Sequence, residues 1–159
     1  MTESTPFTMD EIAEHIRDTD FESFGHADAW AVGQAIAAIA AERSLPITAA
    51  IWLGEQRVFH FAAAGTSADN NHWMERKAAL VRRYDAPSWL TTLRWRGYGI
   101  TEATPLLGLD PTIHTLSGGG FPIRVRGTSV GVAVISGTND NAEHDLVVEV
   151  LTAHRATQS

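Results

Sequence analysis

Hydrophobic and polar positions along the chain follow two rhythms, a helical period of about 3.6 residues and short apolar runs typical of buried strands. The clearest helical segment follows the polar stretch after Gly65 and runs to about Arg83. Asp69, Asn70 and Asn71 can accept hydrogen bonds from the free amides of a first turn, so we expect the helix to start there. One face of this helix carries Trp73, Lys77, Leu80, Val81 and Tyr84.

The rest of the chain divides into further helices and two pairs of strands. Helices are predicted over residues 9–17 and 28–43, from Ser88 up to Gly97, and after the turn at 139–141. Strands are predicted over residues 47–53, 58–62, 121–125 and 130–136, and the segments 54–57 and 126–128 have the length of hairpin loops. Residues 20–25 are predicted to be a connector, and residues 101–117 a loop with at most one helical turn.

This order of elements predicts an α/β protein of the α+β type. Two hairpins separated by helices should form an antiparallel sheet, with the helices packed on one side of it. The length of 159 residues suits a single domain over residues 1–159. Within it, residues 1–8 are expected to be disordered.

The charge and composition narrow the function. The chain has 19 acidic and 12 basic residues, a formal net charge of −7, which argues against a nucleic-acid partner. The absence of cysteine excludes disulfides and thiolate metal sites, and it favours a cytoplasmic location. Met1 to Phe7 lack the pattern of a signal peptide, and no apolar run approaches the ~20 residues that span a bilayer, so no membrane partner is expected.

The basic residues are unevenly distributed. Half of them lie between Arg76 and Arg96, where Asp85 is the one acidic residue. A solvated helix face that pairs with acidic helices of the same or a neighbouring chain is the favoured explanation. A site for an anionic ligand is the alternative.

Lys77 is the only lysine in the sequence, and it falls within an apolar stripe. Its stem could pack along Trp73 while the ammonium reaches water. Alternatively the ammonium is buried, which requires an anion or hydrogen-bond acceptors nearby. A compact point charge can occupy a hole into which a planar guanidinium does not fit.

Three glycines, Gly118, Gly119 and Gly120, precede Phe121 and Pro122. Their amides could form a small anion-binding concavity. A plain turn into an edge strand that tolerates proline is an equal alternative. The run is not a phosphate loop, because no Gly-Lys-Ser/Thr follows it.

The seven histidines show no pair at a spacing of three to five residues, so no metal site is predicted. A single axial ligand to haem needs no such spacing. The run Glu143-His144-Asp145 could serve acid and base chemistry, but acidic residues there also suit the start of a helix. No nucleophile elbow is present.

Several of these motifs together resemble the haem-degrading-domain family, which includes HbpS-like and GlcG-like proteins. They are Gly65-Thr66 with Asp69-Asn70; Trp73, Arg76 and Lys77; Gly118-Gly119-x-Phe121-Pro122-Ile123; and the run from Gly131 to Gly137. The similarity covers about residues 21–154 and is greatest to the small stand-alone branch of the family.

The resemblance implies a profilin-like or sensory-domain-like fold and assembly into a homo-oligomer. Haem or corrinoid binding and slow haem breakdown are the activities it implies, with haem as the possible cofactor. Family members often carry a histidine before the double glycine. Ser117 stands there in this chain, which leaves a ligand role at that position in doubt.

These observations predict an oligomeric domain that binds a small anionic or haem-like ligand. Its site would comprise Asn70, Trp73, Lys77, Gly118, Gly119, Gly120 and Phe121. Lys77 would neutralise an anionic group, the glycine amides would approach the ligand, and Trp73 and Phe121 would form apolar walls. The alternatives are an enzyme, acting on haem or through a Lys77 amine, and an interaction protein without a ligand.

Overall fold

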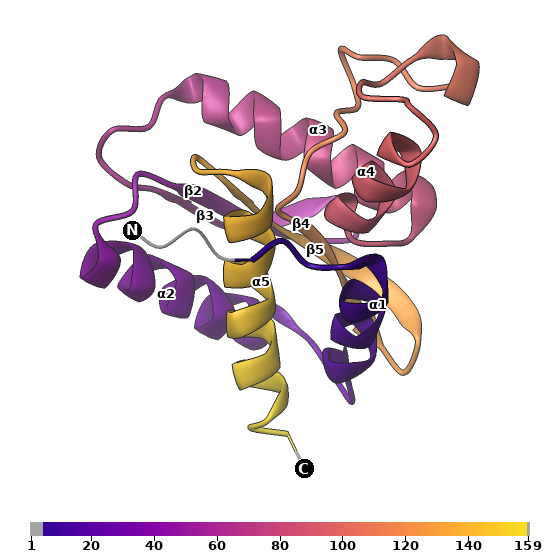
Figure 1. Cartoon of the computed structure of the whole chain (residues 1–159). Coiled ribbons are helices and arrows are strands. Elements are labelled where there is room, and N and C mark those ends of the chain that lie inside the picture. The colour runs from indigo at the N-terminus through magenta and orange to yellow at the C-terminus, as the bar shows by residue number, and fades with distance from the viewer. Residues whose placement is uncertain (1–4, 159) are drawn as a thin grey trace.

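A five-stranded sheet with helices on both faces forms the centre of the computed structural model, which describes residues 5–158 (Figure 1). The helices are α1 (Met9–Asp18), α2 (His26–Arg43), α3 (Ala68–Tyr84), α4 (Ser88–Arg96) and α5 (Asp140–Arg155), with a 3-10 turn η1 (Pro105–Leu107). The strands are β1 (Asp20–Phe21), β2 (Thr48–Leu53), β3 (Gln56–Ala62), β4 (Gly120–Val125) and β5 (Thr128–Ser136). The α+β prediction and both hairpins are confirmed.

The strand order is β1-β4-β5-β2-β3, so the two hairpins meet through β5 and β2, which pair antiparallel. The sheet is mixed rather than purely antiparallel, because β1 pairs in parallel with β4. This strand lies in the segment predicted as a connector. Two residues cannot show an alternating pattern, so the tertiary pairing alone defines the strand.

The prediction that the helices pack on one side of the sheet is wrong. Ala49 and Ile51 of β2 belong to the core shared with α2 and α5, whereas Ala50 and Trp52 pack with α3 on the other face. Figure 1 shows α3 and α4 above the sheet and α2 and α5 below it. The apolar run of β2 has no polar alternate positions, as expected for a strand covered on both faces.

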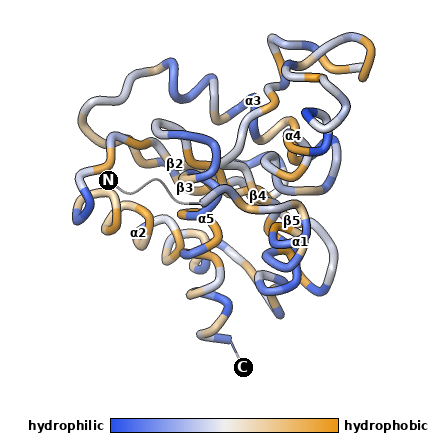
Figure 2. The backbone as a smooth tube through the Cα atoms, in the orientation of Figure 1, coloured by the Kyte–Doolittle hydropathy of each residue, from blue (hydrophilic) through white to orange (hydrophobic). Residues whose placement is uncertain are grey.

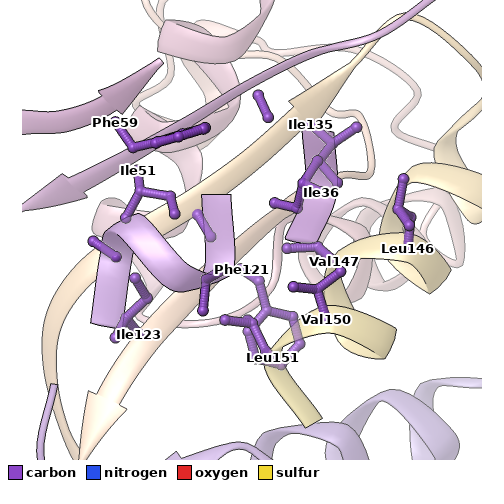
Figure 3. Packing of buried hydrophobic residues seen from close by; sticks show 14 of the residues in the cluster. Ile36, Ile51, Phe59, Phe121, Ile123, Ile135, Leu146, Val147, Val150 and Leu151 are labelled. Carbon is purple, nitrogen blue, oxygen red and sulfur yellow. The ribbon is translucent and has the colours of Figure 1, made fainter. Parts of the chain in front are cut away.

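The larger core lies between the sheet and the pair α2 and α5 (Figure 3). Helix α2 approaches β3 closely at Gly33, where a Cβ atom would lie 2.4 Å from the Phe59 ring. Figure 2 shows hydrophobic residues along α2 and the strands, and many hydrophilic residues on α1 and α3. The absence of a side chain at Gly33 therefore lets α2 lie close against the sheet.

Two local predictions for α3 need correction. Ser67, not the polar run 69–71, is the N-cap: its hydroxyl accepts from the Asp69 amide, and its own amide donates to Asn70 Oδ1 at 3.0 Å. The buried face carries Met74, which is fully buried, while Trp73 is 36% exposed. The buried face of α3 is therefore shifted from Trp73 to Met74, which packs against Ala50 and Trp52 of the sheet.

The predicted disorder of residues 1–8 concerns in part residues 1–4, which lie outside the described residues. Residues next to α1 are held in place. The Phe7 amide donates to Asn141 Oδ1 at 2.9 Å, and Thr8 caps α1 with Glu11 in a reciprocal pair of hydrogen bonds. These hydrogen bonds join Phe7 to α5 and Thr8 to the first turn of α1.

Candidate functional site

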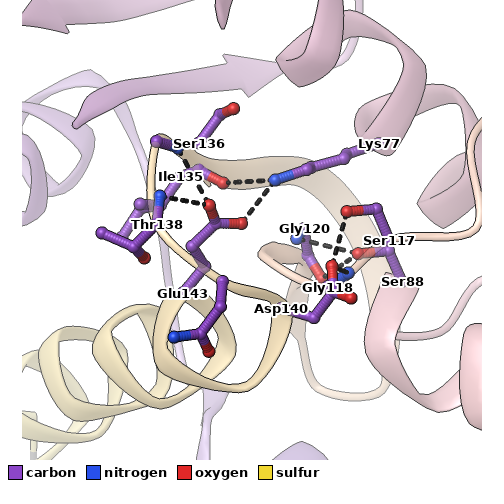
Figure 4. Close-up of polar contacts among 12 residues, drawn as sticks. Lys77, Ser88, Ser117, Gly118, Gly120, Ile135, Ser136, Thr138, Asp140 and Glu143 are labelled. Atoms are coloured by element: carbon purple, nitrogen blue, oxygen red, sulfur yellow. Dashed lines mark hydrogen bonds and ion pairs between the residues drawn. The ribbon is translucent and has the colours of Figure 1, made fainter. Parts of the chain in front are cut away.

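A buried ion pair between α3 and α5 lies at the end of the central strand β5 (Figure 4). Lys77 Nζ is 2.5 Å from Glu143 Oε2, and the two side chains are 2% and 4% exposed. Lys77 comes from the middle of α3, and Glu143 from the first turn of α5. The second interpretation of Lys77, a buried ammonium, is therefore the correct one.

Both charged groups have further hydrogen-bond partners. Lys77 Nζ donates to the Ile135 carbonyl at 3.1 Å, and Glu143 Oε1 accepts from the Gly137 and Thr138 amides at 2.9 and 2.8 Å. Burial raises the pKa of Glu143, while Lys77 and the two amides act in the opposite direction. An ammonium has three donors, so two are used within the protein and one remains.

A hollow of about 370 Å³ lies over this pair, and we call it the lysine hollow. It is formed by the first half of α3, residue 117, and the segment that joins β5 to α5. Its lining comprises Asp69, Asn70, Trp73, Lys77, Ser117, Ser136, Gly137, Thr138, Asn139, Asp140 and Glu143. Hydroxyl, amide and carboxylate groups therefore dominate its surface.

The glycine run lies beside the lysine hollow but is not among the described residues that line it. The Gly118 amide donates to Asp140 Oδ1 at 2.9 Å, and the Gly120 amide donates to Ser88 Oγ at 2.9 Å. These two amides have partners within the protein. Gly119 has a φ of 113°, and a Cβ there would lie 2.5 Å from the Ile135 carbonyl oxygen. The run therefore allows the chain to pass close beside Glu143.

The predicted site residues thus fall into two groups. Asn70, Trp73 and Lys77 line the lysine hollow together. Phe121 is 1% exposed and lies in the core, with its ring centroid 5.8 Å from that of His144. It does not form a wall of the hollow, because the pleat of β4 directs it to the face covered by α2 and α5.

Most of the lining that follows β5 was not predicted from the sequence. Glu143 was considered for acid and base chemistry but not as the partner of Lys77. Ser117, whose hydroxyl donates to Asp140 Oδ1 at 2.7 Å, also lines the hollow. The sequence signal that was available is the lone lysine within an apolar stripe, because a buried ammonium requires a carboxylate partner elsewhere in the chain.

Two histidines meet in the interior away from the hollow. His15 Nδ1 lies 3.0 Å from His144 Nε2, although the residues are 129 positions apart. His144 is fully buried, and its burial lowers its pKa to about 3. The described residues contain no group of three or more histidine, aspartate and glutamate side chains that could hold a metal ion.

Comparison with known proteins gives both a family and a set of relatives. The family model for haem-degrading HbpS-like proteins matches residues 24–152. A UPF0303 protein of Streptomyces avermitilis is 38% identical over 155 residues, which covers 95% of this chain and 93% of that protein.

Solved structures with low sequence identity share the fold. The Ybr137w protein superposes with a TM-score of 0.83 at 20% identity, covering 94% of this chain and 88% of that one. A PduOC:heme complex superposes with a TM-score of 0.67 at 15% identity, covering 83% of this chain and 94% of that one. Within residues 5–158, no helix has the length and apolarity needed to cross a membrane.

Proposed function

Because this chain belongs to the HbpS-like family of haem-degrading proteins, we propose that it binds a small molecule in the lysine hollow. The observation that carries the proposal is the buried Lys77 ammonium at the base of that hollow, with one donor left over. Burying an ion pair costs desolvation free energy. A binding site that uses the remaining donor of the Lys77 ammonium would give a functional reason for retaining the pair. Asn70 and Trp73 would position the ligand from the side.

The lining favours a small polar ligand with hydroxyl or carbonyl groups. The charge of Lys77 is already balanced by Glu143, and Asp69 and Asp140 also face the hollow, so an anionic group bound there directly would meet carboxylates. Hydroxyl groups can donate to these carboxylates and accept from Lys77. The indole of Trp73 offers a flat apolar surface on which a small ring could stack.

Haem is the second candidate, favoured by the family and by the structural likeness to a PduOC:heme complex. The residues of the lysine hollow do not fit it. Trp73 is the one apolar side chain among the described residues that line it, and that lining contains no histidine, methionine or tyrosine to ligate iron. Haem binding or haem degradation here would therefore require a different surface.

Native mass spectrometry of the protein isolated from its own cells tests the proposal. We expect a bound mass smaller than that of haem, retained by the wild type and lost in Lys77→Met if that variant folds. In parallel, haemin titrated into the protein should show the same Soret band as haemin in buffer alone. A shifted Soret band with a one-to-one endpoint would favour haem, and a ligand-free wild type would favour an interaction protein without a ligand.

We also propose that the protein is a cytoplasmic homo-oligomer. The absence of cysteine is consistent with a reducing compartment. Trp30, Tyr98 and Leu106 are 57%, 76% and 82% exposed, and burial against a second copy would remove their apolar surface from water. The same native mass spectra report the number of subunits, and a monomer mass would contradict this part of the proposal.

A further inference from the structure

A second hollow of about 440 Å³ adjoins the lysine hollow, and we call it the arginine hollow. The two share Trp73, Ser117 and Asp140 as lining residues. A single small molecule lying over Ser117 could therefore reach both. The chemistry of the second hollow differs from that of the first, because it is lined by two guanidinium groups and an imidazole, those of Arg76, Arg96 and His114.

Arg76 lies in the arginine hollow without a carboxylate partner among the described residues. Its guanidinium stacks over the Trp73 ring at 4.3 Å, and its Nη1 donates to the Pro111 carbonyl at 3.4 Å. Stacking on an indole fixes the plane of the guanidinium, whose five donors exceed the partners it has. A planar fork held in this way is suited to bidentate binding of a carboxylate or a phosphate.

Arg96 is held in a similar way by α4. Its guanidinium lies 5.2 Å from the Trp89 ring centroid, and its Nη2 is 3.5 Å from Asp140 Oδ2. Asp140 also accepts from Ser117 and Gly118 through its other oxygen, so its carboxylate is well supplied with donors. The long contact to Arg96 therefore leaves most of that guanidinium available to a ligand.

The other ionisable side chains that line the arginine hollow, besides Asp140, are His114 and Glu102. The Asp110 amide donates to His114 Nδ1 at 3.3 Å, so Nε2 carries a proton and can donate to a ligand. Glu102 is exposed. Arg96 has its one long contact with Asp140, and Arg76 has no ion pair among the described residues, so both guanidinium groups can take an anion.

We propose that the arginine hollow is an anion-binding subsite, which takes a carboxylate or phosphate group of the ligand whose polar body lies in the lysine hollow. This inference rests on the function proposed above and specifies its ligand as a small hydroxylated acid or phosphate ester. It also assigns the anion to Arg76 and Arg96 rather than to Lys77. Two of the six basic residues between Arg76 and Arg96 then have a function at this hollow.

Calorimetric titration at low ionic strength with tartrate and with inorganic phosphate tests the subsite. We expect at least one of these anions to bind the wild type with a Kd of about a millimolar or below, and Arg76→Gln and Arg96→Gln to weaken it by about tenfold or more each. Arg94→Gln is the matched control, because Arg94 is an exposed arginine of the same helix α4 that is not among the described residues lining either hollow. It should bind as the wild type does.

Tighter binding of tartrate would identify a carboxylate subsite, and tighter binding of phosphate a phosphate subsite. Binding of neither anion, or an equal loss in Arg94→Gln, would overturn the inference. Circular dichroism establishes that each variant is folded. A bound native ligand with no acidic group would leave the proposed function standing and end this inference, whereas a ligand-free native protein would end both.

Discussion

Lys77 and Glu143 lie 66 positions apart in the chain, and each compensates the other's charge in the interior. Neither would be stable there alone, because an uncompensated buried charge costs several kcal/mol. The Ile135 carbonyl and the Gly137 and Thr138 amides fit a compact ammonium and one carboxylate. This arrangement gives a physical reason for a lysine in a chain that otherwise uses arginine.

Substitution of Glu143 by glutamine should destabilise the fold strongly. The variant keeps the shape of the side chain but leaves the Lys77 ammonium buried without its anion, so we expect a loss of about 3–5 kcal/mol in the free energy of unfolding. Urea denaturation measures it. The control is Glu149→Gln, which breaks the half-exposed pair with Arg43 and should cost less than about 1 kcal/mol.

The double variant Lys77→Met, Glu143→Leu distinguishes a charge effect from a packing effect. Removing both charges should leave the protein more stable than either single variant, because no buried charge then lacks a partner. A double variant that loses the sum of both single losses would contradict this account of the pair.

At the scale of elements, the segment that runs from residue 117 into β4 lies in close contact with β5, with the residues after β5 and with the start of α5. Gly119 lies at the centre, where the left-handed backbone and the lack of a Cβ are both required. An added Cβ would meet the Ile135 carbonyl oxygen at 2.5 Å and Glu143 Oε2 at 2.9 Å. The group that approaches Gly119 closely is therefore strand β5, and not a ligand.

Replacement of Gly119 by alanine should therefore destabilise the protein by at least about 1–3 kcal/mol, from backbone strain and from displacement of Glu143. Gly127→Ala is a matched control, since Gly127 also has a positive φ, of 81°, but has no atom within 4 Å of an added Cβ. The loss of stability in Gly127→Ala therefore measures the cost of backbone strain alone. Equal losses in guanidinium denaturation would show that the contact with Glu143 contributes nothing.

At the scale of the whole molecule, the order of the N-terminal segment depends on α5. The Phe7 ring contacts both His15 and His144 edge-on, with centroid distances of 4.8 and 5.5 Å. Burial lowers the pKa of both imidazoles, that of His144 to about 3. The native state thus holds His144 neutral, whereas the unfolded chain takes up a proton near its ordinary pKa of 6.5.

Stability should consequently fall as the pH decreases from 6.5 towards 3. The folded pKa of His144 is depressed, so its contribution is fully present above pH 6.5 and is lost as the pH falls through this window. The slope due to this group approaches about 1.4 kcal/mol per pH unit. Urea denaturation between about pH 7 and 5 should show a flatter profile in His144→Gln, while the exposed control His72→Gln keeps the wild-type slope.

The sequence alone determined the type and approximate bounds of the longer elements. Residues 69–83 show a helical period over several turns, and the segment 28–43 lies between Asp28 near its start and Pro46 after its end. The apolar runs around Ile51 and Val134 are short and bounded by turns. These are local properties of the chain. The family resemblance rests on motifs of the same local kind, and the family match confirms it.

Only the tertiary structure decided how these elements combine. In the folded protein both faces of the sheet are covered, β1 pairs as a parallel strand, and Trp73 is partly exposed. Glu143 contacts Lys77, and His144 contacts His15. Such pairings join residues that are far apart in the chain, and a periodic pattern records that a side chain is buried but not which partner it meets. The lysine hollow belongs to this second class, because its lining comes from α3, residue 117 and the segment that leads into α5.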